Sequence, residues 1–176
     1  MAQAHVRVSP VDRKEKSGSV DHHDIEQFLF MEAKLLDQKR FNEWADLFCE
    51  DGTYWIPTEE EQVDPYSHAS IIFDDKQSMM ARIRRLGHPM IHAQSPPSRT
   101  THIVTNIMTD LRMDKKEEFL VDACFTMFEY RDDEQLMYGG RYTYNLKILG
   151  GLLLIDKKIV KLVNSDAAHN IMAVYI

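Results

Sequence analysis

Residues 119–128, FLVDACFTMF, alternate in polarity with a period of two, and this alternation predicts a β-strand. Apolar side chains dominate one face, at Phe119, Val121, Ala123, Phe125 and Met127. The other face also carries apolar atoms, at Leu120, Cys124 and Phe128. A strand of this kind is covered on both faces, or one of its faces lines a pocket or contacts a partner.

The same pattern continues on both sides of this segment. It predicts further strands over residues 102–107, 136–149 and 152–163, with turns at Lys115-Lys116, Asp132-Asp133 and Gly150-Gly151. A short strand at 53–56 is expected to end at Pro57, and residues 70–73 form a short apolar run.

Helical periodicity is confined to the part of the chain that precedes these strands. A helix is expected to begin near Asp21, and its apolar stripe from Ile25 to Leu36 is interrupted only by Glu32. A second helix is expected over 41–49 and a third after Asp74-Asp75, through Leu86. Helices followed by antiparallel strands predict an α+β fold in which the helices pack on one face of a curved sheet.

The length of 176 residues predicts one domain over residues 20–176, preceded by a mobile arm at 1–19. The net charge of −7 argues against a nucleic-acid partner, because phosphate binding requires the opposite sign. The chain shows neither a secretory signal nor an apolar run of about 20 residues, so we expect a cytoplasmic protein with no membrane segment. Cys49 and Cys124 are expected to be buried and free.

Metal and cofactor motifs are weak. The sequence contains no phosphate-binding loop, dinucleotide fingerprint or nucleophile elbow. His88 and His92 have helical spacing, but prolines surround them, and His22 and Asp24 form a His-x-Asp pair at a helix start where capping is the simpler role. We therefore expect no metal site in this chain.

An acid–base site is one hypothesis for the histidine on the strand at 102–107. Asp46 or Asp51, together with Tyr54 and His102, could meet inside the fold as a base and an electrophile. The simpler interpretation is that Asp51-Gly52 is a turn, that the Tyr54 hydroxyl is satisfied internally and that His102 is an ordinary strand residue. Arg82, Arg84 and Arg85 are expected to point largely outward, either into solvent or toward an acidic partner.

Several segments resemble the small (β) subunit of aromatic-ring-hydroxylating dioxygenases. They are Glu32–Asp37 (EAKLLD), Phe41–Trp44, Leu47–Pro57 (LFCEDGTYWIP), Phe73–Asp75, Arg82–Leu86 (RIRRL), Pro96–Thr100 (PPSRT) with Val104 and Asn106, and Ile159–Asp166 (IVKLVNSD). Together they span about residues 25–170 in the order of that family.

The resemblance implies a cystatin-like cone, the fold of ketosteroid isomerase and scytalone dehydratase, and an accessory subunit without catalytic, cofactor-binding or metal-binding residues. It also implies an α subunit that carries the Rieske [2Fe–2S] cluster and the mononuclear iron, an α3β3 hexamer, and a reductase and ferredoxin that deliver electrons from NAD(P)H. The holoenzyme would convert an aromatic compound and O₂ to a cis-dihydrodiol. Arg99, Arg82, Arg85, Asp51 and Tyr54 would have structural or subunit-interface roles.

Two alternatives remain beside this interpretation. The chain could be a self-contained dehydratase or isomerase that uses Asp51, Tyr54 and His102, or a binding module of the transport-factor type. In the accessory-subunit interpretation, Arg99 is expected to be buried and paired with a carboxylate, either Asp37, Asp46 or Asp51 or an acidic group on α. The apolar segment 170–176 is expected to pack on the sheet or in a subunit contact.

Overall fold

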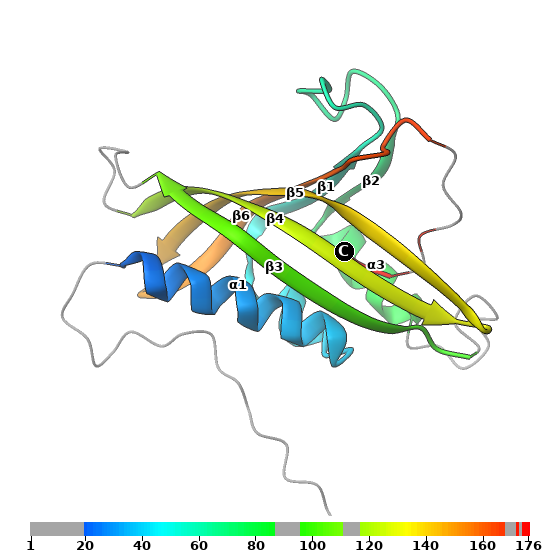
Figure 1. Ribbon diagram of the computed structural model, residues 1–176. Helices are drawn as coiled ribbons and strands as arrows, with labels where there is room; N and C mark the ends of the chain where they lie inside the picture. Colours follow the sequence, from blue (N-terminus) through cyan, green and yellow to red (C-terminus); the bar gives the residue numbers. More distant parts are fainter. Residues whose placement is uncertain (1–19, 87–95, 111–116, 168–171, 173) are drawn as a thin grey trace, which may run out of the picture.

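The computed structural model describes residues 20–86, 96–110, 117–167, 172 and 174–176. One twisted six-stranded sheet forms the body of the molecule, and helices lie against one of its faces (Figure 1). The α+β prediction is therefore confirmed. The predicted arm at 1–19 and the turn at Lys115-Lys116 lie outside the described residues.

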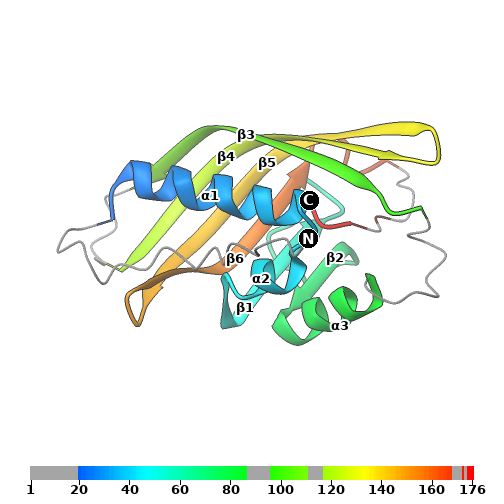
Figure 2. The same ribbon diagram turned by 90° about the horizontal axis from the view of Figure 1, so that it is seen from below.

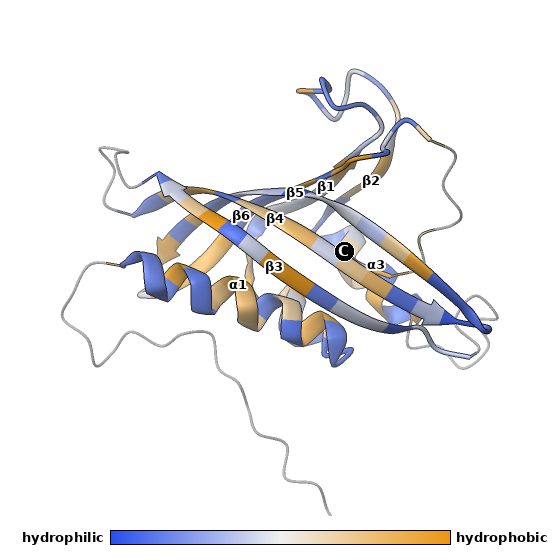
Figure 3. Ribbon diagram, viewed as in Figure 1, coloured by the Kyte–Doolittle hydropathy of each residue, from blue (hydrophilic) through white to orange (hydrophobic). Residues whose placement is uncertain are grey.

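The first helix, α1 (His22–Asp37), begins after Asp21 as predicted, and its apolar side is buried as the sequence predicts. Asp21 caps it: the Asp21 side chain accepts a hydrogen bond from the main-chain N–H of Asp24, and the Asp24 carboxylate accepts one from the N–H of Asp21. Its buried side chains are Ile25, Phe28, Leu29, Glu32, Ala33, Leu35 and Leu36. Figure 3 shows hydrophobic and hydrophilic segments alternating along α1.

The second helix is shorter than predicted. α2 (Phe41–Ala45) ends at Ala45 with Asp46 as its C-cap, and strand β1 (Phe48–Pro57) begins where the periodicity favoured more helix. Pairing with a distant strand explains the difference, because the main-chain N–H of Ile155 donates to the carbonyl of Leu47 (2.8 Å). A sheet partner more than 100 residues away thus overrides the local helical preference.

The Asp51-Gly52 pair is not the predicted turn but part of β1. The register between β1 and the last strand shifts between Phe48 and Thr53. A Cβ atom on Gly52 would lie 2.9 Å from the carbonyl oxygen of Ile155, so the absence of a side chain allows the two strands to approach closely.

The remaining elements follow the predicted order. They are β2 (Ser70–Asp75), α3 (Lys76–Leu86), β3 (Arg99–Asp110), β4 (Glu118–Arg131), β5 (Glu134–Leu149) and β6 (Leu152–Leu162). Of these, β2, β3, β4 and β5 are longer than predicted. The turns at Asp132-Asp133 and Gly150-Gly151 are confirmed, and all four residues have positive φ.

The sheet order is β2-β1-β6-β5-β4-β3, with β1 and β6 parallel and the other neighbours antiparallel. Seen from below in Figure 2, α1 crosses the concave side of the sheet. α2 and α3 lie near β1 and β2, at the opposite edge of the sheet from β3. The inward side chains of β4, from Phe119 to Met127, are buried under α1 and the neighbouring strands. The end of the chain also enters this core, since Val174, Tyr175 and Ile176 are at most 8% exposed.

Candidate functional site

Glu32 occupies the centre of the space between α1 and the sheet. Its Oε1 accepts hydrogen bonds from Trp44 Nε1 (2.9 Å) and Lys158 Nζ (2.8 Å), and its Oε2 accepts one from the Tyr144 hydroxyl (2.8 Å). These four residues, here called the Glu32 cluster, are all buried. Every polar group that the cluster contributes has a partner within it, so it fills the interior with a satisfied network.

Burial shapes the electrostatics of this interior. Loss of hydration lowers the pKa of Lys158, and the adjacent Glu32 carboxylate opposes that shift. Burial and the nearby carboxylate raise the pKa values of Tyr142 and Tyr144 well above 10. The Lys158 ammonium also lies 4.2 Å from the centre of the Tyr142 ring, a cation–π contact.

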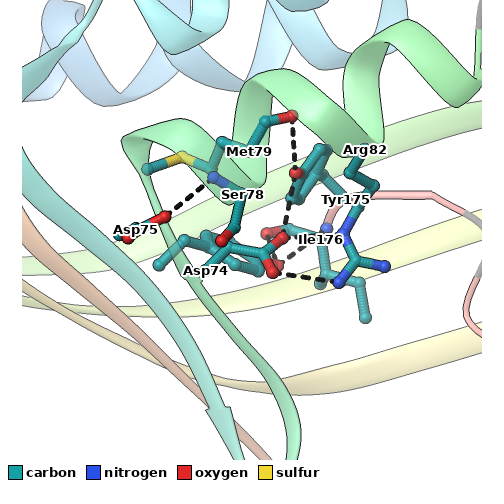
Figure 4. A network of polar contacts seen from close by, with 8 residues as sticks. Asp74, Asp75, Ser78, Met79, Arg82, Tyr175 and Ile176 are labelled. Atoms are coloured by element: carbon teal, nitrogen blue, oxygen red, sulfur yellow. Dashed lines mark hydrogen bonds and ion pairs between the residues drawn. The ribbon is translucent and has the colours of Figure 1, made fainter.

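A second buried network ties the end of the chain to β2 and α3 (Figure 4). The Arg82 guanidinium binds both carboxylate oxygens of Asp74, through Nε (2.7 Å) and Nη2 (3.1 Å), and the Tyr175 hydroxyl donates to Asp74 Oδ2 (3.1 Å). The Tyr54 hydroxyl donates to the main-chain oxygen of Ile176 (3.0 Å) and accepts from its N–H (3.1 Å). The prediction that the apolar tail packs against the fold is confirmed for these residues.

The structure does not bring the predicted acid–base residues together. Asp51 is exposed and lies near Cys49 and Asp156, the Tyr54 hydroxyl is used by Ile176, and His102 binds Asp37. Asp46 is exposed after α2. Candidate groups with separate sets of neighbours do not form one reaction centre.

Asp37, a residue not considered for this role from the sequence, is the partner of His102. Its Oδ1 lies 2.6 Å from Nδ1 of His102, and its Oδ2 accepts from the main-chain N–H of the same residue (3.0 Å). The Thr100 hydroxyl donates to Oδ1 as well (3.0 Å). The end of α1 is thereby fixed to the edge strand β3.

The prediction that Arg99 is buried in an ion pair with a carboxylate of this chain is wrong. Arg99 is exposed, and its guanidinium lies 4.6 Å from the centre of the Tyr130 ring. Asp37, one of the expected partners, is bound by Thr100 and His102. Arg99 is the first residue of the edge strand β3 and belongs to the alternating set of β3 residues that are exposed. This position explains why Arg99 is not buried.

The arginines of α3 differ from one another. Arg82 does not point outward as expected but turns to Asp74, whereas Arg84 and Arg85 are exposed. Arg82 therefore has a structural contact within the chain. The interface role of Arg85 stays a prediction.

Among the described residues, His22 and Asp24, the pair considered for a metal site, make separate contacts. His22 contacts Thr109 (3.1 Å) and Glu26 (3.5 Å), while Asp24 takes part in the helix cap. The capping role is therefore confirmed for Asp24. His88 and His92 lie outside the described residues.

The cysteines do not suit an iron–sulfur cluster. Cys49 lies on β1 and Cys124 on β4, with β6 and β5 between them, so about three strand spacings, or about 14 Å, separate the two strands. A Rieske cluster needs two cysteines and two histidines around one pair of irons. The two thiols are therefore too far apart to be the two cysteine ligands of one such cluster, and the absence of a cofactor from this chain stays a prediction.

One other set of potential metal ligands occurs in the described part of the chain. Potential ligand atoms of Cys49, Asp51 and Asp156 lie within 4.8 Å of one another. Asp156 already binds the Lys147 ammonium (2.7 Å), and burial raises the pKa of the Cys49 thiol. A protonated thiol and a neutralised carboxylate are poor metal ligands. Absence of a metal from this chain remains a prediction.

None of the helices in the described ranges has the length and apolar character that a membrane span requires.

Comparison with solved structures supports the fold. The β subunit of benzoate 1,2-dioxygenase from Burkholderia mallei aligns with a TM-score of 0.73 at 24% identity, over 90% of this chain and 99% of that chain. A protein described as a scytalone dehydratase, from Novosphingobium aromaticivorans, aligns with a TM-score of 0.57 at 17% identity, over 79% of this chain and 81% of that chain. The cone-shaped α+β fold is thus confirmed.

Sequence comparison identifies the family. The β subunit of biphenyl 2,3-dioxygenase from Rhodococcus jostii RHA1 is 37% identical over 122 residues, which span 65% of this chain and 65% of that subunit. The sequence model of the family described as "Ring hydroxylating beta subunit" matches residues 31–167. The chain therefore belongs to the family of ring-hydroxylating β subunits.

Proposed function

We propose that this chain is the non-catalytic, structural β subunit of an aromatic-ring-hydroxylating dioxygenase. In this proposal it binds an α subunit that carries the Rieske [2Fe–2S] cluster and the mononuclear iron, and three α and three β chains form a hexamer in the cytoplasm. The complete enzyme is an oxidoreductase that converts an aromatic compound to a cis-dihydrodiol with O₂ and electrons that a reductase and ferredoxin pass on from NAD(P)H.

The interior of the cone is the observation that supports a structural role. Where an enzyme of this shape would need open space, the Glu32 cluster and the buried residues Tyr142, Tyr175 and Ile176 fill the interior between the helices and the sheet. The positions of Cys49 and Cys124 agree with a cluster that belongs to a partner chain. The family relation supports the α partner.

The experiment is co-expression of this chain with the α chain that the proposal requires, which is to be sought among the neighbouring genes. We expect an α3β3 complex by light scattering, and iron and visible absorbance that follow the α chain. This chain purified alone should be colourless and free of stoichiometric iron or zinc after dialysis against a chelator. A stable monomer of this chain in the presence of α would contradict the proposal.

Three substitutions test the non-catalytic role. Asp51→Asn, Tyr54→Phe and His102→Gln should each leave the kcat of the assembled complex within about threefold of the unmodified enzyme. Loss of a catalytic acid or base typically lowers the rate by about 10²–10⁴-fold. A loss of that size with the hexamer intact would instead support the alternative, a dehydratase or isomerase-like acid–base site in this chain.

A further inference from the structure

The outer face of the sheet, on the side away from the helices in Figures 1 and 2, carries a patch of uncharged side chains on β3, β4 and β5. Thr126 and Phe128 alternate along β4 with the buried Phe125 and Met127, so they face away from the core. Cross-strand pairing extends this set into two adjacent rows, here called the outer patch: Thr101, Phe128 and Met137, and Ile103, Thr126 and Gly139.

The outer patch has the composition of a covered surface. Ile103 is 50% exposed and Met137 is 69% exposed. The side of an antiparallel sheet that faces water is normally polar, whereas depletion of charged residues is typical of the core of a protein–protein interface.

Gly139 has no explanation within the chain. Its φ is not positive, and a Cβ atom there would make only an ordinary contact, 3.7 Å from the carbonyl oxygen of Phe125. A Cβ atom on Gly140, in contrast, would collide with the carbonyl oxygen of Lys161. A glycine within a strand weakens it, and close approach of another backbone is one reason for its presence. The internal packing thus requires Gly140, while an approach from outside accounts for Gly139.

Two arginines border the outer patch. Arg99 lies in the next row at one end and Arg141 in the next row at the other end. Both side chains are exposed, and neither has a carboxylate partner among the described residues. Asp122, one row beyond Arg141, already accepts a hydrogen bond from Thr143 (2.7 Å). The patch therefore suits a partner surface that combines apolar and acidic side chains.

The chain itself presents such a surface in the loop between β1 and β2, residues 58–69, which projects from the sheet in Figure 1. Val63 is 90% exposed and Tyr66 is 83% exposed. The exposed acidic side chains of the loop are Glu59, Glu60, Glu61 and Asp64. The loop therefore matches the outer patch in both apolar character and charge.

The side chain of Gln62 holds this loop in one shape. Its residue is only 5% exposed, its Oε1 accepts from the main-chain N–H of Thr58 (3.1 Å), and its Nε2 donates to the carbonyl oxygens of Asp64 (3.3 Å) and His68 (3.4 Å). A loop that is ordered before docking loses little conformational entropy when it binds.

We propose that the outer patch of one chain binds the loop 58–69 of a second copy of this chain. Val63 and Tyr66 of the second copy cover the patch, and its glutamates at 59–61 meet Arg99 and Arg141. Direct contact between two outer patches is disfavoured, because it would bring arginines of like charge together.

The contact joins two different surfaces, so each chain keeps one of each for its neighbours, and head-to-tail contacts of this kind can close into a ring. A ring of three chains agrees with the proposed hexamer. The number of chains in the ring rests on that proposed function.

Sedimentation of the full chain without α, over a range of concentrations, tests the contact. We expect trimers that dissociate on dilution. Met137→Glu should weaken self-association at least about tenfold, because it places a carboxylate where the acidic loop docks. The matched control is Leu149→Glu, at the other end of β5, where the side chain is 48% exposed. Its association should stay within about twofold of the unmodified chain, and urea midpoints check that both variants fold.

Charge reversal tests the pairing of the two surfaces. Arg99→Glu with Arg141→Glu reverses the patch, and Glu59→Lys, Glu60→Lys and Glu61→Lys together reverse the loop. Each set alone should weaken self-association at least about tenfold, because like charges then meet. A chain that carries both sets should recover to within about threefold of the unmodified chain. All five side chains are exposed, so the reversals should leave the urea midpoint of the monomer unchanged.

A chain that stays monomeric without α would overturn this inference, even if it forms a hexamer with α. Failure to bind α would instead contradict the function proposed above. Dimers that never grow into trimers would overturn the head-to-tail contact. So would reversed chains that associate as tightly as the unmodified chain, or a combined chain that shows no recovery.

Discussion

Glu32 and Lys158 lie 126 residues apart in the sequence and form an ion pair in the centre of the cone, with 2.8 Å between Oε1 and Nζ. The two side chains are 1% and 0% exposed. The pair joins α1 to β6, and removal of one member would leave the other charge without compensation in a dry interior.

Lys158→Met should therefore lower the free energy of unfolding by about 3–5 kcal/mol, measured by urea denaturation. The double variant with Glu32→Gln should recover at least half of this loss, because the neutral amide introduced by Glu32→Gln can accept from Trp44 through its oxygen and donate to the Tyr144 hydroxyl through its NH₂ group, without a buried charge. Lys147→Met is the matched control. The Lys147–Asp156 pair is partly exposed, and its loss should cost at most about 1 kcal/mol. Equal losses in the two lysine variants would contradict the prediction.

Tyr142→Phe should make the chain less sensitive to alkali. Below pH 10 this tyrosine is neutral in the folded and the unfolded chain; above pH 10 the unfolded chain loses the proton and the folded chain keeps it, because burial raises the pKa of Tyr142. Stability therefore falls as the pH rises past 10, by about 1.4 kcal/mol per pH unit for each such tyrosine. The variant should reduce this slope by about that amount.

The hydroxyl of Tyr142 has no partner among the described residues, so Tyr142→Phe should change stability at pH 7 by less than about 1 kcal/mol. Tyr66, which is 83% exposed, supplies the control, and Tyr66→Phe should leave the alkaline slope unchanged. Denaturant midpoints between pH 8 and pH 11 measure both variants. An unchanged slope in Tyr142→Phe would show that this side chain ionises normally.

Arg82→Ala should destabilise the chain by about 3 kcal/mol, because Asp74 is only 7% exposed on its side chain and would lose both charged hydrogen bonds. Arg82→Lys should restore only part of that loss, since an ammonium cannot reproduce the two-pronged contact. Arg85→Ala should stay within about 0.5 kcal/mol in the isolated chain, because Arg85 is exposed. Thermal unfolding of the three variants distinguishes the roles of the two arginines, and a large loss in Arg85→Ala would contradict the assignment.

Arg99→Ala should lower the stability of the isolated chain by at most about 1 kcal/mol, the value of its contact with the Tyr130 ring. Any larger effect should occur in assembly with the α subunit, if an acidic group there binds this exposed guanidinium. Unfolding of the chain alone and sedimentation of the co-expressed complex measure the two effects separately. A loss of about 3 kcal/mol in the chain alone would show that Arg99 has an internal partner.

Local sequence signals predict some of these features and not others. The cap at Asp21 and the apolar stripe of α1 depend on residues within one or two turns, so both could be predicted. The end of α2 could not, because it depends on the pairing of Leu47 with Ile155. Contacts between distant segments cannot be predicted from the periodicity of the local sequence.

The buried polar residues also include features that the sequence predicts and features that it does not. Glu32 interrupts the apolar stripe of α1, and this interruption was a usable signal of a buried polar role. Its partner could not be predicted, because Lys158 faces inward only after the register of β5 and β6 shifts between Asn145 and Leu146. His102 was a candidate from the sequence, but its pairing with Asp37 depends on how α1 lies along β3.

The parallel pairing of β1 with β6 has a consequence for folding kinetics. β4, β5 and β6 are joined by short turns, and each can pair with its neighbour soon after it forms. β1, in contrast, must wait for a strand near the other end of the chain, since Trp55 pairs with Ile159. Closing a loop of that length costs chain entropy before any contact repays it. We expect the β1–β6 pairing to form late and to limit the folding rate. The strands β3 to β6 would then pair with one another before β1 and β2 join the sheet.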